Sequence, residues 1–167
     1  LVGMAIWKPY VMDRFTTLLH HDDFQGSGYQ VRQSLIAIGT GGVFGKGLGQ
    51  SIQKFNFLPE AHGDSVFAVA AEELGFVGAV TVILLYLLFA LRGLWIAARA
   101  PDQFSRLLAV GLVILITAQS FVNIASMLAI APLTGVPLIF ISQGGTALLV
   151  AMTEVGILLN ISRYRRL

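Results

Sequence analysis

The chain has 167 residues, of which 56% are hydrophobic and 12% are charged; a soluble domain carries about 25% charged residues, so water is not the main solvent of this chain. Its formal net charge of +2 does not indicate nucleic-acid binding, because the Lys and Arg residues lie at the ends of apolar segments rather than on one soluble face. The absence of cysteine excludes disulfides, thiolate nucleophiles and Cys-based metal sites.

The first six residues, Leu1 to Ile6, have neither the charged start nor the cleavage site of a signal peptide. We expect residues 1–6 to form the end of an earlier helix, which makes the chain a C-terminal fragment of a larger protein. From residue 7 to residue 65 the composition becomes polar and glycine-rich, with basic and acidic residues in balance. We interpret residues 7–65 as a large extracytoplasmic loop.

A glycine-rich stretch dominates this loop, with six glycines in the eleven residues from Gly39 to Gly49. It does not fit a phosphate-binding P-loop, because Thr40 occupies the first glycine position and Gly47 follows the lysine. It does not fit the dinucleotide fingerprint either, because Phe44 stands where the last glycine belongs. ATP and NAD are therefore not expected. Two interpretations remain. One is a turn region in which glycine permits positive φ and close packing, and the other is a functional loop.

The segment just before these glycines, Gln33 to Gly39, is an apolar run that is too short to cross a bilayer but long enough to enter its interface. We predict a partly re-entrant, non-helical loop here. Irregular backbone at membrane depth is stable only where it is buried in protein or lines a wet cavity. The loop therefore also predicts a cavity that opens outward.

Three long apolar segments follow the loop. We predict transmembrane helices at residues 66–91, 107–131 and 137–161, since each supplies the roughly 20 residues of helix that a hydrocarbon core requires. Asp64, just ahead of the first helix, is its expected N-cap. The predicted fold class is all-α: a polytopic membrane helix bundle in which residues 1–167 form a single membrane domain.

The arginines indicate the orientation of these spans. Three of them fall in residues 92–106 with a single acidic residue, and three more fall in residues 162–167. By the positive-inside rule both segments are cytoplasmic. The uncharged turn at residues 131–137 and the loop at residues 7–65 then lie outside the cytoplasm.

Titratable side chains gather at the mouth of the first span, where Glu60, His62 and Asp64 stand close together. This combination allows acid–base chemistry. The structural alternative for Asp64 is helix capping, which the helix dipole also favours. His20 and His21 lie beside two aspartates, as in a solvated turn, and the spacing typical of zinc ligands is lacking.

Further polar groups lie inside the predicted spans. Glu72 and Glu73 are about 12 Å into the first helix and, being consecutive, point to different faces, unless the helix begins deeper than predicted. Glu154 interrupts the third span, and we expect it to be paired or protonated, since carboxylates at such depth face the bundle interior or a water-filled cavity. Gln119 and Asn123 share a face of the second span and are interpreted as interhelical hydrogen-bonding groups.

Taken in order, these residues resemble the C-terminal part of the SEDS family (shape, elongation, division and sporulation), peptidoglycan glycosyltransferases that include FtsW, RodA and SpoVE. The loop and the first span carry most of the resemblance, in the motifs Gly26-Ser27-Gly28-Tyr29-Gln30, Gln33-Ser34, Gly45-x-Gly47-Leu48-Gly49, Gln53-Lys54, Leu58-Pro59-Glu60-Ala61-His62-x-Asp64 and Glu72-Glu73-Leu74-Gly75. The later motifs are Asn123-Ile124, Pro132-x-Thr134-Gly135-x-Pro137-Leu138 and Ile141-Ser142-x-Gly144-Gly145.

The division type, FtsW, is the closer likeness, because the elongation type usually differs between Gly47 and His62. The chain also departs from the family in two places. The family commonly has Thr-Asp-Phe where this chain has Gly63-Asp64-Ser65, and it has Tyr-Gly-Gly-Ser-Ser where this chain has Gln-Gly-Gly-Thr-Ala at residues 143–147.

The resemblance implies polymerisation of lipid II, in which a sugar hydroxyl of one disaccharide attacks the anomeric carbon of another and expels polyprenyl pyrophosphate. It places the family's loop aspartate at Asp64, which is the expected catalytic base. A pyrophosphate leaves as a stable anion, which needs cations more than an acid. The substrate-binding candidates are therefore basic or positioning residues of the loop: Arg14, Lys46, Lys54, Glu60 and His62. The other candidates are carboxylates of the spans: Glu72, Glu73 and Glu154.

No metal site is predicted and no cofactor is evident, with a divalent cation left open. The implied partners are lipid II, a single-span class B penicillin-binding transpeptidase, other division proteins and membrane lipid, without nucleic acid. The implied location is the bacterial cytoplasmic (inner) membrane, and we expect the isolated fragment to be inactive. Two alternatives stay open: a lipid II transporter (flippase) whose path Glu72 and Glu154 line, and a non-catalytic division scaffold in which Asp64 is replaceable.

Overall fold

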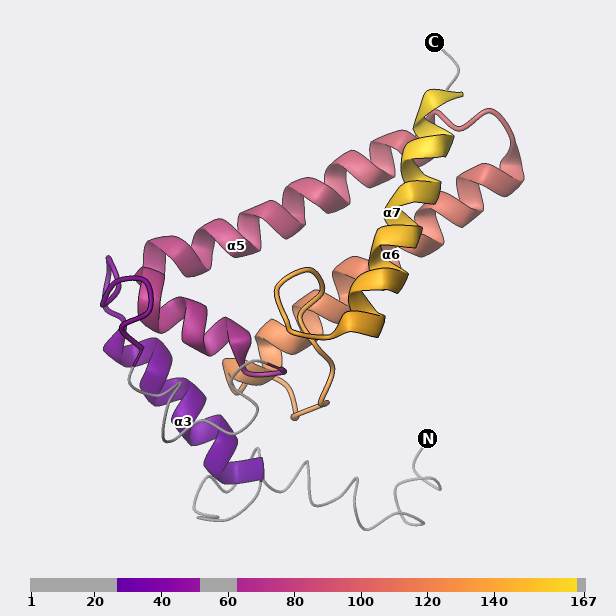
Figure 1. Cartoon of the computed structure of the whole chain (residues 1–167). Coiled ribbons are helices and arrows are strands. Elements are labelled where there is room, and N and C mark those ends of the chain that lie inside the picture. Colours follow the sequence, from indigo (N-terminus) through magenta and orange to yellow (C-terminus); the bar gives the residue numbers. More distant parts are fainter. Residues whose placement is uncertain (1–26, 52–62, 165–167) are drawn as a thin grey trace, which may run out of the picture.

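The structure is a computed structural model that describes residues 27–51 and 63–164. Within these ranges the chain forms four helices, α3 (Ser27–Thr40), α5 (Val66–Ala98), α6 (Gln103–Met127) and α7 (Gly145–Arg163), and no strands. Figure 1 shows α5 and α6 joined by a tight turn, with α7 lying across α6 and α3 beside the first part of α5. The predicted all-α class is confirmed.

Three of these helices, α5, α6 and α7, are long and apolar enough to cross a membrane. Many large apolar side chains on them are exposed, among them Leu85, Leu88 and Leu149. Such residues cost free energy in water but not in lipid. The predicted set of three spans is therefore confirmed for the described residues.

The ends of the first two spans differ from the predicted ones. Helix α5 continues past residue 91 to Ala98. In this last part the Arg92 and Arg99 guanidinium groups lie over the Trp95 ring, 4.4 and 3.7 Å from its centroid. Helix α6 already begins at Gln103. Its N-cap is Asp102, whose carboxylate accepts hydrogen bonds from the Ser105 amide at 2.9 Å and hydroxyl at 2.7 Å.

The third span begins later than predicted, at Gly145 rather than residue 137. Residues 128–144, which we call the α6–α7 connection, are irregular. Phe140 has a φ of 71°, a left-handed value that a helix does not allow, and Pro137 has no amide hydrogen to donate. Apolar content alone could not reveal this, because the connection is nearly as hydrophobic as the helix that follows.

The predicted non-helical segment at Gln33 to Gly39 is wrong, since these residues belong to the 14-residue helix α3. Val31, Ser34 and Ala37 are all buried and recur every third residue, which is one face of a helix. The prediction missed this because it considered only how apolar the segment is. The irregular backbone lies just after α3, in residues 41–51, which we call the glycine loop.

Helix α5 is broken at Gly75, which has φ 70° and ψ −167°. In an unbroken helix the amides of Phe76 and Val77 would donate to the carbonyls of Glu72 and Glu73, four residues earlier. The break leaves all four groups without their helical partners. Figure 1 shows the resulting bend between a short first segment and a long second segment of α5.

The backbone of the glycine loop replaces all four lost partners. The substitute hydrogen bonds run from the Lys46 amide to the Glu72 carbonyl (3.0 Å), the Gly47 amide to the Glu73 carbonyl (3.0 Å), the Phe76 amide to the Gly42 carbonyl (2.9 Å) and the Val77 amide to the Val43 carbonyl (3.2 Å). A buried backbone group left unpaired would cost about 1–3 kcal/mol. The loop therefore makes the break stable, and the break gives the loop a fixed place.

Two hydrophobic clusters hold the remaining elements together. One, around Phe67, Tyr86 and Met127, joins α5, α6 and the α6–α7 connection. The other lies near the α5–α6 turn, where a Cβ added to Gly93 would come within 2.3 Å of Val113. Glycine thus lets α5 and α6 approach closely at this end.

Replacing Gly45 by alanine tests the contact between the loop and the break. A Cβ at Gly45 would lie 2.1 Å from the Glu73 carbonyl oxygen, and the φ of 79° is left-handed. We expect Gly45→Ala to lower the free energy of unfolding of the full-length protein by about 1–3 kcal/mol or more, measured by denaturant titration in detergent. Gly111→Ala is the control, because a Cβ there meets nothing within 4 Å. Equal stability of the two variants would contradict the packing described.

Candidate functional site

Asp64 lies immediately before the first segment of α5, and its side chain is half-buried. The N-cap of α5 is Ser65, so the prediction that Asp64 is the N-cap is wrong. The Asp64 carboxylate points towards the α6–α7 connection, where a Cβ added to Gly135 would be 3.4 Å from Oδ2. Because Gly135 lacks that Cβ, the connection leaves space beside the carboxylate.

Three consecutive residues at this point are held by three different elements. The Gly63 carbonyl accepts a hydrogen bond from the Ser142 hydroxyl of the connection at 2.7 Å. The Asp64 carbonyl accepts one from the Asn123 Nδ2 of α6 at 2.8 Å. The Ser65 hydroxyl accepts one from the Gln30 Nε2 of α3 at 2.9 Å. Hydrogen bonds from three elements thus fix the backbone that carries the carboxylate.

Further hydrogen bonds stabilise the α6–α7 connection, one within it and two to the helices. The Ser142 hydroxyl accepts from the Leu138 amide at 2.8 Å, and the same Asn123 Nδ2 that holds Asp64 donates to the Val136 carbonyl at 2.7 Å. The Tyr86 hydroxyl donates to the Ile139 carbonyl. These bonds fix the wall that the carboxylate faces.

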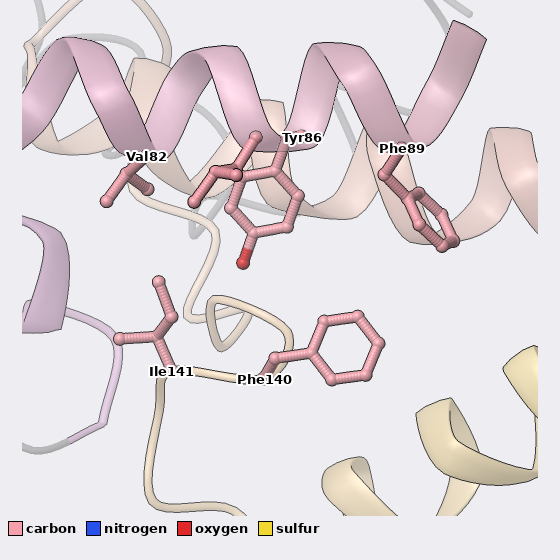
Figure 2. Close-up of a pocket in the computed structure, with 6 residues that line it drawn as sticks. Val82, Tyr86, Phe89, Phe140 and Ile141 are labelled. Carbon is pink, nitrogen blue, oxygen red and sulfur yellow. The ribbon is translucent and has the colours of Figure 1, made fainter. Parts of the chain in front are cut away.

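An apolar cleft of about 210 Å³ lies between α5 and this connection. It is lined by residues of α5 and of the connection: Val82, Leu85, Tyr86, Phe89, Phe140 and Ile141. Figure 2 shows the Tyr86 hydroxyl directed towards the turn that carries Phe140 and Ile141, with the Phe140 ring facing Phe89 across the cleft. The connection therefore lines this apolar cleft with Phe140 and Ile141 and faces the Asp64 carboxylate at Gly135.

A second polar centre lies in the first segment of α5, at Glu72. Its side chain is fully buried, and its carboxylate accepts hydrogen bonds from Lys46 Nζ at 2.7 Å, the Ser51 hydroxyl at 2.5 Å and the Thr40 hydroxyl at 3.4 Å. A buried carboxylate is tolerated only when it is paired and hydrogen-bonded in this way. Glu72 thus locks the side chains of the glycine loop to the helix whose backbone the loop already pairs.

The predicted site residues other than Asp64, Glu72 and Glu154 are placed as follows. Lys46 pairs with Glu72, about two helical turns along α5 from Asp64, and its predicted phosphate contact stays a prediction. Glu73 is half-buried, and its Oε1 has no partner among the described residues. The remaining substrate-binding candidates lie outside the described residues: Arg14, Lys54, Glu60 and His62.

Glu154 faces a cleft between α6, α7 and the α6–α7 connection. The cleft holds about 370 Å³, and its polar lining is Gln119, Thr146 and Glu154. No ion pair or hydrogen bond joins the Glu154 carboxylate to another residue in the described ranges, so a paired or protonated state stays a prediction. Within those ranges, no group of three His, Asp or Glu side chains could share a metal ion, and a divalent cation also stays open.

Sequence reasoning missed several residues that hold this site. Asn123 was interpreted as a hydrogen-bonding group between helices, but its bonds go to the backbone at Asp64 and Val136. Gln30, Ser51 and Ser142 were not singled out, although each lies in or beside a motif of the family. The available signal was the clustering of small polar residues around motif glycines. The partners of these residues could not be deduced without the fold.

Comparison with known proteins finds a matching family and several relatives. The model of the FtsW/RodA/SpoVE family, described as cell cycle protein, matches residues 1–167. The chain is 45% identical to stage V sporulation protein E of Bacillus subtilis over 166 residues, and 46% identical to the peptidoglycan glycosyltransferase MrdB of Escherichia coli K12 over 169 residues. These matches cover 99% and 100% of this chain but 45% and 46% of the relatives, so the chain spans less than half of their length.

Two solved structures are similar over most of the chain. A chain from a study of the structural coordination of polymerization and crosslinking by a peptidoglycan synthase complex matches with a TM-score of 0.72 at 29% identity. This match covers 98% of the present chain and 45% of that chain. The rod shape determining protein RodA of Thermus thermophilus, solved as an aspartate-to-alanine mutant, matches with a TM-score of 0.61 at 34% identity. It covers 80% of the present chain and 40% of RodA.

A double-mutant cycle tests the buried pair at Glu72. Lys46→Met leaves a buried carboxylate without its cation, and we expect it to lower the free energy of unfolding by about 3–5 kcal/mol. Adding Glu72→Gln should recover part of this loss, because the neutral amide no longer needs a cation. The measurement is denaturant titration of the full-length protein in detergent, with the exposed Arg106→Met as the control. If Lys46→Met lowers the free energy of unfolding no more than Arg106→Met does, the stabilising role of the Lys46–Glu72 pair is contradicted.

Proposed function

The chain belongs to the FtsW/RodA/SpoVE family of cell cycle proteins, and on this premise we propose that it is the C-terminal part of a peptidoglycan glycosyltransferase that polymerises lipid II. The relatives named as peptidoglycan glycosyltransferases support the activity. The observation that carries the proposal is the half-buried Asp64 carboxylate, whose backbone is tied by the connection, α6 and α3. Such a fixed carboxylate suits a catalytic base.

In the proposed reaction Asp64 takes the proton from a sugar hydroxyl of the acceptor. The hydroxyl oxygen forms a bond to the anomeric carbon of the donor, and the bond from that carbon to the pyrophosphate oxygen breaks. The electron pair leaves with the polyprenyl pyrophosphate, which is a stable anion and needs cations rather than an acid. Atoms and charge balance once the protonated Asp64 returns its proton to water.

Cations for the leaving group are proposed from the loop around the site. Arg14 and Lys54 are the first candidates, with Glu60 and His62 as positioning groups. Lys46 is the weaker candidate, because its ammonium group already lies 2.7 Å from the buried Glu72 carboxylate and only 30% of its side chain is exposed. A phosphate would have to compete with that carboxylate for the same cation.

We further propose the biological setting. The protein lies in the bacterial cytoplasmic membrane, with the glycine loop and Asp64 on the outer face. It works with a class B penicillin-binding transpeptidase, which the similarity to a chain from a peptidoglycan synthase complex supports. The motifs between Gly47 and His62 favour the division type. Sporulation, FtsW and MrdB relatives match at 45%, 42% and 46% identity, so overall identity does not separate the branches.

The two alternatives, transporter and scaffold, gain less support. A transporter path lined by Glu72 would need that carboxylate to be accessible, whereas its side chain is fully buried and held by Lys46, Ser51 and Thr40. A scaffold would not need a carboxylate whose backbone is fixed by three elements. The scaffold alternative predicts that Asp64 is replaceable.

Replacing Asp64 tests the catalytic proposal directly. We expect Asp64→Asn to lower the rate of glycan polymer formation from lipid II by about 100-fold to 10,000-fold, because the amide cannot take a proton. The assay uses the full-length protein purified with its transpeptidase partner. The matched control is Asp102→Asn at the start of α6, since asparagine is an equally good N-cap. An unchanged polymer yield from Asp64→Asn would contradict the assignment of Asp64 as the catalytic base.

The proposed orientation has a separate test. This chain has no cysteine, so Leu48→Cys in the glycine loop and Gln103→Cys at the α5–α6 turn can be labelled individually once any cysteine elsewhere in the full-length protein has been replaced. Both side chains are exposed. We expect a membrane-impermeant thiol reagent added to intact cells, with the outer membrane permeabilised where one is present, to label only Leu48→Cys. Labelling of Gln103→Cys alone would show the opposite orientation and contradict the proposed one.

A further inference from the structure

One buried amide links the catalytic carboxylate to the wall beside it. Asn123 of α6 is 1% exposed, and its Nδ2 donates to the Asp64 carbonyl at 2.8 Å and to the Val136 carbonyl at 2.7 Å. We propose that Asn123 is a positioning residue that holds Asp64 in place for proton abstraction. The inference rests on the proposed function and extends it to a residue that does not touch the substrate.

The orientation of this amide follows from its contacts. Both hydrogen-bond partners of the Asn123 side chain are carbonyl oxygens, which accept hydrogen bonds. Only the nitrogen of the amide can therefore face them. The other end, Oδ1, is buried and has no partner in the described part of the chain. A buried unpaired acceptor is costly. An apolar residue would pack here without that cost, which indicates that the two donated bonds are the reason for the asparagine.

The two accepting carbonyls belong to the two segments that meet at the Asp64 carboxylate. One belongs to Asp64 itself. The other belongs to Val136, the neighbour of Gly135, where an added Cβ would be 3.4 Å from Asp64 Oδ2. One side chain therefore sets the distance between the backbone that bears the base and the connection that faces it. Ser142 repeats the arrangement one residue earlier, through the Gly63 carbonyl.

This distance matters because general-base catalysis depends on geometry. The base must come within about 2.6–3.2 Å of the hydroxyl whose proton it takes. A displacement of about 1 Å can lower the rate about 100-fold even when the change is made away from the reacting atoms. Loss of the two bonds from Asn123 would let Asp64 and the connection shift relative to each other, whereas substrate binding elsewhere in the loop would remain.

The test compares variants of the full-length protein, purified with its transpeptidase partner and supplied with lipid II. Asn123→Asp keeps the shape of the side chain but loses the amide donors, and Asn123→Ala removes it. We expect both to lower kcat, by up to about 100-fold, with KM unchanged. Ser142→Ala should lower kcat in the same sense but less, and it provides a second variant should the Asn123 variants fail to fold.

The matched control is Ser126→Ala on the same helix. Ser126 is also 1% exposed, but its hydroxyl donates only to the Asn123 carbonyl within α6. It should keep the wild-type kcat. Wild-type kcat in folded Asn123 variants would overturn the positioning role. It would also be overturned if the Asn123 and Ser142 variants lost activity with a raised KM and only in proportion to their lowered unfolding midpoints. If Asp64→Asn abolishes polymer in the same assay, that failure leaves the proposed function intact; if Asp64→Asn is fully active, both fail.

Discussion

The structure depends on an exchange of backbone hydrogen bonds at Gly75. A helix that breaks inside a membrane exposes amides and carbonyls for which lipid offers no partner, so such a break survives only if protein supplies the partners. Here the glycine loop supplies all four, two amides and two carbonyls. A Cβ on Gly45 or on Gly75 would collide with the opposing backbone. Close approach thus explains Gly41 and Gly45, and positive φ explains Gly42, Gly47 and Gly49.

The break has a consequence for the site, because it separates a short first segment of α5 from the long span. Asp64 stands at the N-terminal end of that short segment, and the buried Glu72 lies near its other end. Lys46 and Ser51 lock the glycine loop to Glu72, while Gln30, Asn123 and Ser142 hold the residues around Asp64. The segment is therefore fixed at both ends. Rigid support of this kind is what a positioned carboxylate requires.

Part of this could be predicted from the sequence and part could not. The three spans followed from the lengths of apolar runs, and Asp64 followed from its place in a family motif. The helix α3 was missed because Val31, Ser34 and Ala37 form a buried stripe that includes a serine, so hydrophobicity alone did not reveal its period. The late start of α7 was missed because the connection before it is apolar yet irregular. The partners of Glu72 and Asn123 depend on contacts between segments far apart in the chain, which no local pattern encodes.

Amide hydrogen exchange on the full-length protein in lipid nanodiscs tests the paired loop and break most directly. Lys46, Leu48 and Gly49 are all exposed residues, but of these three only Lys46 has its amide bonded to the α5 break. The account predicts that the amides of Lys46 and Gly47 exchange as slowly as those within α5, while those of Leu48 and Gly49 exchange rapidly. Equally rapid exchange along the whole stretch from Lys46 to Gly49 would contradict it.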